Sequence, residues 1–165
     1  MARSSQSVGH RQRFMIALDT NFLVYAHRSD NPFHLIARTA IARLAQGALP
    51  WGVPVVCVHE FLAVVTNPKI FKQATPAKLA FEQVRSLLAL PTARLLMPTH
   101  HHLDILSQLT ESAKTVGAQF HDARIATICL ENGVTQLWTA DRDFSAYPLL
   151  STQSPQDLVA AGFAR

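Results

Sequence analysis

The sequence predicts a single α/β domain in which helices cover both faces of a mostly parallel sheet. Short apolar segments alternate along the chain with longer helical ones, which is typical of strand–helix–strand units. The short segments are almost continuously apolar, as expected for strands that are buried on both faces. With 165 residues, 48% of them hydrophobic, the chain can form one domain with a substantial core.

Four strands are expected from the apolar segments. The first, MIAL, covers residues 15–18, and the second, VPVVCV, covers residues 53–58 with Pro54 near its start. The third, RLLM, covers residues 94–97, and the fourth, QLWT, covers residues 136–139.

Helices are expected between and after these strands. Several are followed by residues that commonly end a helix, such as Gly47 and Gly117. The expected helices cover residues 21–27, 33–47, 59–66, 76–90, 101–117, 121–133 and, as a short terminal helix, 154–162.

The first fourteen residues, MARSSQSVGHRQRF, are polar and basic and have no periodicity. They predict a disordered leader at 1–14 and a single domain at 15–165. The leader lacks the apolar stretch of a secretory signal, and no segment is long enough for a transmembrane helix. We therefore expect a cytoplasmic protein without a membrane partner.

Cys57 and Cys129 lie in apolar segments without metal-ligand spacing, which predicts reduced core residues.

Acidic residues stand where expected elements begin or end. Asp19 directly follows the first strand, and Glu60 follows the second strand by one residue. Asp141 and Asp143 follow the fourth strand, and Asp122 opens the helix that leads to it. Because functional crevices of parallel sheets lie at the carboxyl ends of their strands, we expect these carboxylates to meet at one edge.

A divalent cation would compensate this concentration of negative charge. Oxygen ligands from separate elements suit Mg²⁺ or Mn²⁺, as one or two ions, whereas zinc would require histidine and cysteine. The run THHH at 99–102 looks metal-like, but it stands at a helix start and is interpreted as structural. With five acids at one site, 15 basic residues would face six acids elsewhere, which favours a polyanionic substrate.

Most of these acids also have a local explanation. Asp19 could cap the first helix, and Asp122 could interact with a helix dipole. Asp141 and Asp143 could be turn residues. Glu60 has no such explanation, and the joint pattern favours a metal site.

Four stretches carry a family resemblance: ALDTNFLVYA, VHEFLAVVTNP, FHDARIATICLENGV and LWTADRDF. Through them the chain, from Met15 to about Leu150, resembles PIN-domain proteins, and specifically the VapC-type toxin ribonucleases of type II toxin–antitoxin systems. The specific feature is the order Asp, Glu, Asp, Asp. The resemblance implies a PIN-like three-layer α/β domain, with a central, mostly parallel sheet of four or five strands and helices on both faces.

The resemblance also implies a metal-dependent endoribonuclease. Matching motif positions give the catalytic, metal-binding quartet Asp19, Glu60, Asp122 and Asp141, with Asp143 as a further metal ligand and Thr139 as a supporting hydroxyl. Since water would attack the phosphodiester, the products should carry a 5′-phosphate and a 3′-hydroxyl. Candidates for holding the RNA backbone are Arg124, Arg142, Lys69 and Lys72.

The implied partners are an RNA, such as transfer or ribosomal RNA, and a cognate VapB-type antitoxin that offers a basic side chain to the acids. A homodimer is also expected, because the helices at 33–47 and 76–90 carry much apolar surface: Ile36, Ile41, Leu79, Val84 and Leu87. These helices could instead pack on each other within a monomer.

Two other functions are compatible with parts of the pattern. A catalytically silent PIN-type RNA-binding or scaffold domain is one alternative, although the complete quartet argues against it. A magnesium-dependent phosphatase or receiver domain is another. The first strand ends in a single aspartate, without a DxD motif or a later lysine at a strand end, which disfavours this second alternative.

Overall fold

The fold is built around five parallel strands in the order β3-β2-β1-β4-β5. The computed structural model describes residues 14–163. The predicted leader therefore lies outside the described residues, apart from Phe14. The strands are β1 (Ile16–Leu18), β2 (Trp51–Pro54), β3 (Ala93–Leu96), β4 (Gln136–Trp138) and β5 (Ser151–Gln153).

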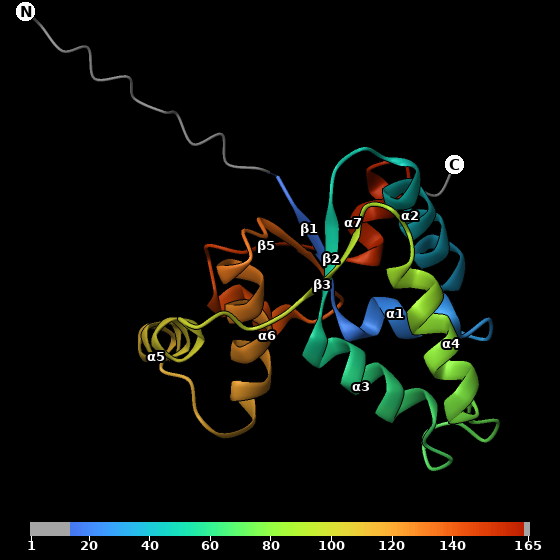
Figure 1. The fold of residues 1–165 in the computed structure, drawn as a ribbon, viewed down its shortest axis with the longest axis horizontal. Coiled ribbons are helices and arrows are strands. Elements are labelled where there is room, and N and C mark those ends of the chain that lie inside the picture. The colour runs from blue at the N-terminus through green and yellow to red at the C-terminus, as the bar shows by residue number, and fades with distance from the viewer. Residues whose placement is uncertain (1–13, 164–165) are drawn as a thin grey trace, which may run out of the picture.

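Helices flank this sheet on both faces, so the domain has three layers. Figure 1 shows the sheet nearly on edge, with α5 and α6 on one side and α1, α2, α4 and α7 on the other. The α-helices within residues 14–163 are α1 (Thr20–His27), α2 (His34–Gln46), α3 (Val55–Val65), α4 (Ala77–Leu88), α5 (His102–Ala113), α6 (Phe120–Glu131) and α7 (Pro155–Ala160). The predicted α/β class with a parallel sheet is confirmed.

The core lies between the sheet and its helices and contains large aromatic side chains. Trp51, Trp138, Phe22 and Phe144 are all less than 2% exposed. Burial of each such side chain stabilises the fold by roughly 1.5–3 kcal/mol. Strand β2 also needs a glycine, because a Cβ at Gly52 would lie 2.6 Å from side-chain carbons of Leu96 on β3.

The second expected strand is wrong in its extent. It ends at Pro54, and the four following residues, 55–58, are the start of α3. Pro54 has extended backbone angles and stands at the N-cap position, where it ends the strand and begins the helix. The valines there have high strand propensity, but α3 packs on α1 and α4, where Val58 is buried and Val55 and Val56 are partly buried.

Helix α5 and strand β5 also differ from the sequence expectation. Helix α5 ends at Ala113 rather than at residue 117, because Lys114 adopts a left-handed conformation with φ of 52°. Strand β5 comes from a polar segment, Ser151–Gln153, which lacks the apolar pattern used to find the other strands.

The order of the strands creates a switch point at the centre of the sheet. From β1 the chain moves outward to β2 and β3, and it then returns to place β4 on the other side of β1. A crevice is expected at the carboxyl ends of the two strands beside such a reversal. The backbone of Asp19, directly after β1, donates to the carbonyl of Trp138 at the end of β4, with an N–O distance of 3.0 Å.

Away from this point, the histidine run at 99–102 has a structural role. The carboxylate of Glu131 on α6 accepts hydrogen bonds from the Thr99 hydroxyl and from Nδ1 of His102, each 2.7 Å long.

Cys57 and Cys129 are buried free thiols, as predicted. Among residues 14–163, no helix is long and apolar enough to span a bilayer.

Candidate acidic site

Three aspartates form a close group at the switch point. Asp122, Asp141 and Asp143 each offer a carboxylate oxygen, and these oxygens lie within 4.8 Å of one another. Asp122 lies in the first turn of α6, while Asp143 lies in the short 3-10 helix η2 (Arg142–Ala146) and Asp141 caps it. The predicted convergence of acids from the fourth strand and the preceding helix is thus present.

The electrostatics of this group suit a cation. The pKa of Asp122 is raised to about 6, chiefly by burial and further by the charges of Asp141, Asp19, Asp143 and Glu60. The other four acids are therefore close enough to disfavour ionisation of Asp122. Carboxylates in such a cluster are stabilised by a divalent ion with oxygen ligands, so the residues present fit Mg²⁺ or Mn²⁺.

Asp19 lies behind the close group and is held by several donors. Its side chain is 4% exposed, and burial raises its pKa, while hydrogen bonds from neighbouring groups oppose this shift. Oδ2 accepts from the Thr139 hydroxyl at 2.6 Å and from the Asn21 amide at 2.9 Å. Oδ1 accepts from the backbone of Thr20 at 2.7 Å and lies 3.6 Å from Sγ of Cys57.

Glu60 reaches the site from a helix rather than from the end of a strand. It lies in the middle of α3, where its side chain is exposed. The Thr20 hydroxyl donates to its Oε2 at 2.7 Å. Since Thr20 also directs its backbone N–H to Asp19, this residue connects two predicted acids that are 41 positions apart in the sequence.

Thr139 lies between Asp19 and Asp141 and contacts both. It is 2% exposed, and its hydroxyl donates to Asp19 and accepts from the Asp141 backbone at 2.9 Å. Asp141 in turn accepts from the backbone of Asp143 at 2.8 Å. The hydroxyl of Thr139 thus connects the buried carboxylate of Asp19 to the turn that carries Asp141 and Asp143.

The local explanations of these acids also hold in the structure. Asp19 is the N-cap of α1, and Asp141 is the N-cap of η2. A capping role and a site role are compatible, because each carboxylate has several lone pairs.

Sequence reasoning missed three residues that contact these acids: Thr20, Asn21 and Cys57. Thr20 and Asn21 directly follow Asp19 in the stretch LDTN, and a hydroxyl and an amide beside an acid were a usable signal. Cys57 carried no such signal, since it is separated from Asp19 by 38 positions.

The predicted RNA-contacting residues lie on different elements. Arg142 is exposed and lies on η2 between two of the acids. Arg124 is on α6, and its Nε atom is buried without a hydrogen-bond partner among the described residues. Lys69 and Lys72 are exposed in the loop after α3, which carries the chain roughly 16 Å away from the sheet edge.

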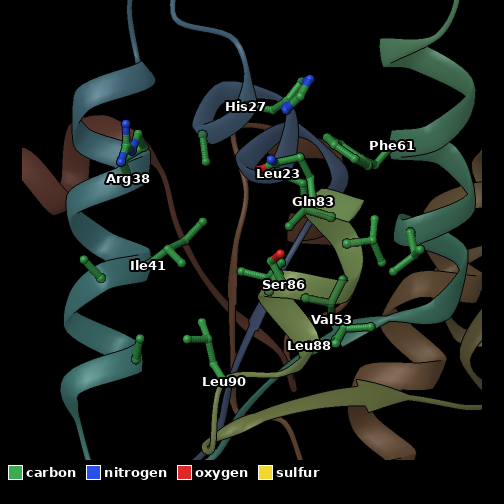
Figure 2. Close-up of a pocket in the computed structure, with 16 residues that line it drawn as sticks. Leu23, His27, Arg38, Ile41, Val53, Phe61, Gln83, Ser86, Leu88 and Leu90 are labelled. Atoms are coloured by element: carbon green, nitrogen blue, oxygen red, sulfur yellow. The ribbon is translucent and has the colours of Figure 1, made fainter. Parts of the chain in front are cut away.

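A separate groove of about 370 Å³ lies between α2 and α4, with α1 and α3 beside it. Figure 2 shows Arg38 and Ile41 of α2 facing Gln83 and Ser86 of α4 across this groove. Three of the residues expected on an apolar surface line it, namely Ile41, Val84 and Leu87. Ile36 is instead buried in the core of the monomer, so its assignment to an external surface is wrong. Leu79 is 50% exposed and lies outside the groove.

Comparison with known proteins places this chain in one family. Residues 16–150 match the family model described as PIN domain. Ribonuclease VapC43 of Mycobacterium tuberculosis is 37% identical over 143 residues, which cover 87% of this chain and 97% of the relative. VapBC2 from Rickettsia felis, solved with a DNA fragment from their promoter, has a TM-score of 0.64 at 14% identity over 86% of this chain and 98% of that chain.

A further structural neighbour is VapC20 of Mycobacterium tuberculosis, described as a Sarcin-Ricin loop cleaving toxin. Its TM-score is 0.55 at 20% identity, and the match covers 79% of this chain and 93% of that chain. Both structural matches share the α/β fold seen here. The family model over residues 16–150 and the 37% identity to VapC43 show that the chain belongs to the PIN-domain family and, within it, to the VapC ribonucleases.

Proposed function

We propose that this protein is a metal-dependent endoribonuclease and the toxin of a VapBC-type toxin–antitoxin pair. The observation that carries this proposal is the group of three carboxylates within 4.8 Å at the switch point of the sheet. The VapC ribonucleases to which the chain belongs support RNA as the substrate.

Asp122, Asp141 and Asp143 would hold one or two Mg²⁺ or Mn²⁺ ions, while Asp19 and Glu60 add negative charge beside them. A bound ion lowers the pKa of water and neutralises charge that develops on the phosphate. Asp19, Glu60, Asp122 and Asp141 form the catalytic set. Attack by water leaves a 5′-phosphate and a 3′-hydroxyl.

RNA would approach the acids along the exposed edge of the sheet. Arg142 is exposed next to Asp141 and Asp143 in the sequence, which places a cation near the phosphate. Arg124, Lys69 and Lys72 would contact more distant parts of the backbone. Transfer RNA and ribosomal RNA loops are the substrates to test, because single-stranded bases can be read directly.

The antitoxin would bind in the groove between α2 and α4. The groove is lined mainly by apolar side chains, and Arg38 adds one exposed cation. An apolar helix face with an acidic residue would complement this surface. The antitoxin would also direct a basic side chain to the acids, where several carboxylates would stabilise it. RNA and antitoxin both imply action in the cytoplasm.

A homodimer is part of the proposal. Leu79 and Phe81 of α4 are 50% and 47% exposed, and a second copy would cover them. Light scattering over a dilution series should give the mass of a dimer, and a monomer mass at every micromolar concentration would contradict it.

Cleavage assays with purified protein test the nuclease. Transfer RNA and a ribosomal RNA fragment with the Sarcin-Ricin loop are incubated with Mg²⁺, with Mn²⁺ or with EDTA. We expect cleavage only with metal, and 5′-phosphate ends on the products. Cleavage that survives exhaustive chelation, or 2′,3′-cyclic phosphate ends, would overturn the metal mechanism.

The same assay separates the enzyme from a catalytically silent RNA-binding or scaffold domain. A silent domain would bind RNA in a gel-shift experiment and leave it uncut under every metal condition. The three carboxylates within 4.8 Å of one another argue for the enzyme, since an RNA-binding scaffold has no need for like charges grouped this closely.

A further inference from the structure

The side-chain amide of Asn21 joins the two chain segments that meet at the switch point. Its Nδ2 donates to Oδ2 of Asp19 at 2.9 Å and to Oγ1 of Thr139 at 3.1 Å. Its Oδ1 accepts from the backbone of Ala140 at 3.1 Å. Both amide hydrogens and the carbonyl oxygen are thus used, and they span 119 positions in the sequence.

These three contacts require an amide in one orientation. If the nitrogen and oxygen were exchanged, the oxygen would face the Asp19 carboxylate and the nitrogen would face the N–H of Ala140. Both contacts would be repulsive. An aspartate of the same shape would place a second carboxylate against Asp19, and alanine would leave all three groups without this partner.

The contacts of Asn21 extend to the close group of acids. Thr139 receives one hydrogen bond from Asn21, and the same hydroxyl accepts the backbone N–H of Asp141 at 2.9 Å. Asp141 then accepts the backbone N–H of Asp143 at 2.8 Å. The positions of Asp141 and Asp143 therefore depend on the turn at residues 139–141, which the hydrogen bonds of Asn21 hold in place.

We propose that Asn21 is a positioning residue for this site: its amide fixes the turn at 139–141 against Asp19, and so places Asp141 and Asp143 opposite Asp122. Asn21 acts through these residues and touches no reacting atom. The expected effect of Asn21 on metal affinity rests on the proposed nuclease function. Its expected effect on the turn at residues 139–141 does not, because that effect concerns only the structure of the protein.

A matched control exists elsewhere in the chain. Asn132 is also half-buried, and its Nδ2 also donates twice, to the carbonyls of Met97 at 2.9 Å and Ile128 at 2.8 Å. It follows α6 at the end remote from Asp122. Asn132→Ala should therefore lower stability without affecting the acidic site.

Two measurements test the proposal on Asn21→Ala, Asn132→Ala and the unmodified protein. Hydrogen exchange without metal should be faster at the amides of Ala140 and Asp141 in Asn21→Ala, and unchanged there in Asn132→Ala. Calorimetric titration with Mn²⁺ should give an affinity about 10-fold to 100-fold weaker in Asn21→Ala, as for other residues that orient metal ligands. Asn21→Asp should not restore the slower exchange.

Unchanged exchange at Ala140 and Asp141 in Asn21→Ala would overturn the role in holding the turn. Faster exchange with an unchanged Mn²⁺ affinity would overturn the role in placing the acids. If the unmodified protein binds no Mn²⁺ and cleaves no RNA, the proposed function fails instead, and the exchange rates still decide whether Asn21 holds the turn.

Discussion

The hydroxyl of Thr139 donates a 2.6 Å hydrogen bond to Oδ2 of Asp19, although 120 residues separate the two in the sequence. They are 2% and 4% exposed, so water does not compete for the contact. The parallel pairing of β1 with β4 brings the two residues together at the ends of their strands. A charged acceptor makes this bond stronger than one between neutral groups.

Thr139→Val should lower both stability and RNA cleavage. The substitution keeps the shape of the side chain, but leaves the buried Asp19 carboxylate without its shortest donor. An unsatisfied buried group costs about 1–3 kcal/mol, which corresponds to a melting temperature lower by about 2–4 °C for each kcal/mol. Calorimetry and the cleavage assay measure the two effects.

Thr127→Val is the matched control for this change. Thr127 is 0% exposed, but its hydroxyl donates within α6, to the carbonyl of Ala123 at 2.8 Å. Its replacement should leave cleavage unchanged. Equal loss of cleavage in the two variants would mean that Thr139 acts only through general stability.

Asp122→Asn should abolish RNA cleavage and yet raise the melting temperature of the metal-free protein. The charge of Asp122 is unfavourable in the folded state, as its pKa of about 6 indicates. Removing the charge relieves burial and repulsion, but also removes a ligand of the proposed ion. Cleavage close to that of the unmodified protein, with Mg²⁺ or Mn²⁺ present, would exclude Asp122 from the catalytic set.

The stabilising effect of Asp122→Asn should depend on pH in a defined direction. The pKa rises from 3.8 to about 6 on folding, so between these values the folded protein binds more protons than the unfolded chain. Stability without metal therefore falls as pH rises through this window. The difference in melting temperature between the variant and the unmodified protein should grow up to about pH 6 and then level off. A difference that does not change with pH would contradict this prediction.

Glu131→Gln should destabilise the fold without changing cleavage. Burial raises the pKa of Glu131, but hydrogen bonds from Thr99 and His102 outweigh it and leave the pKa below its usual value of 4.5. The carboxylate therefore contributes stability above that pH and loses the contribution as pH falls. Melting curves should show a deficit near neutral pH that shrinks in acid, and a loss of cleavage without a loss of stability would contradict the structural role.

Ile41→Glu should weaken binding of the cognate antitoxin and leave RNA cleavage by the isolated protein unchanged. A charge in the groove would be desolvated by an apolar helix face. Leu103→Glu is the control, since Leu103 is 76% exposed on α5, across the sheet from the groove. Calorimetric titration with the antitoxin should separate the two variants, and equal affinities would show that the antitoxin binds elsewhere.

The class of fold and the candidate acids can be predicted from the amino-acid sequence alone. Apolar strands alternating with helices indicate a parallel sheet, and the carboxyl ends of such strands meet at one edge. Asp19 and Asp141 follow strands that pair in this way, so their proximity could be predicted without coordinates. The prediction of the fold class and the prediction of this proximity depend on local sequence pattern and on a general rule of chain topology.

The separation of these acids into a buried residue and a close group follows from packing that the sequence does not show. Asp19 is enclosed by donors, whereas Asp122, Asp141 and Asp143 form the close group, and no local pattern separates these positions. Two of the donors to Asp19 are its neighbours Thr20 and Asn21, but other contacts join residues 38 and 120 positions apart, namely those of Cys57 and Thr139 with Asp19. Such contacts depend on how elements pack, and for the same reason strand propensity failed at residues 55–58, where a helix that packs on α1 and α4 formed instead.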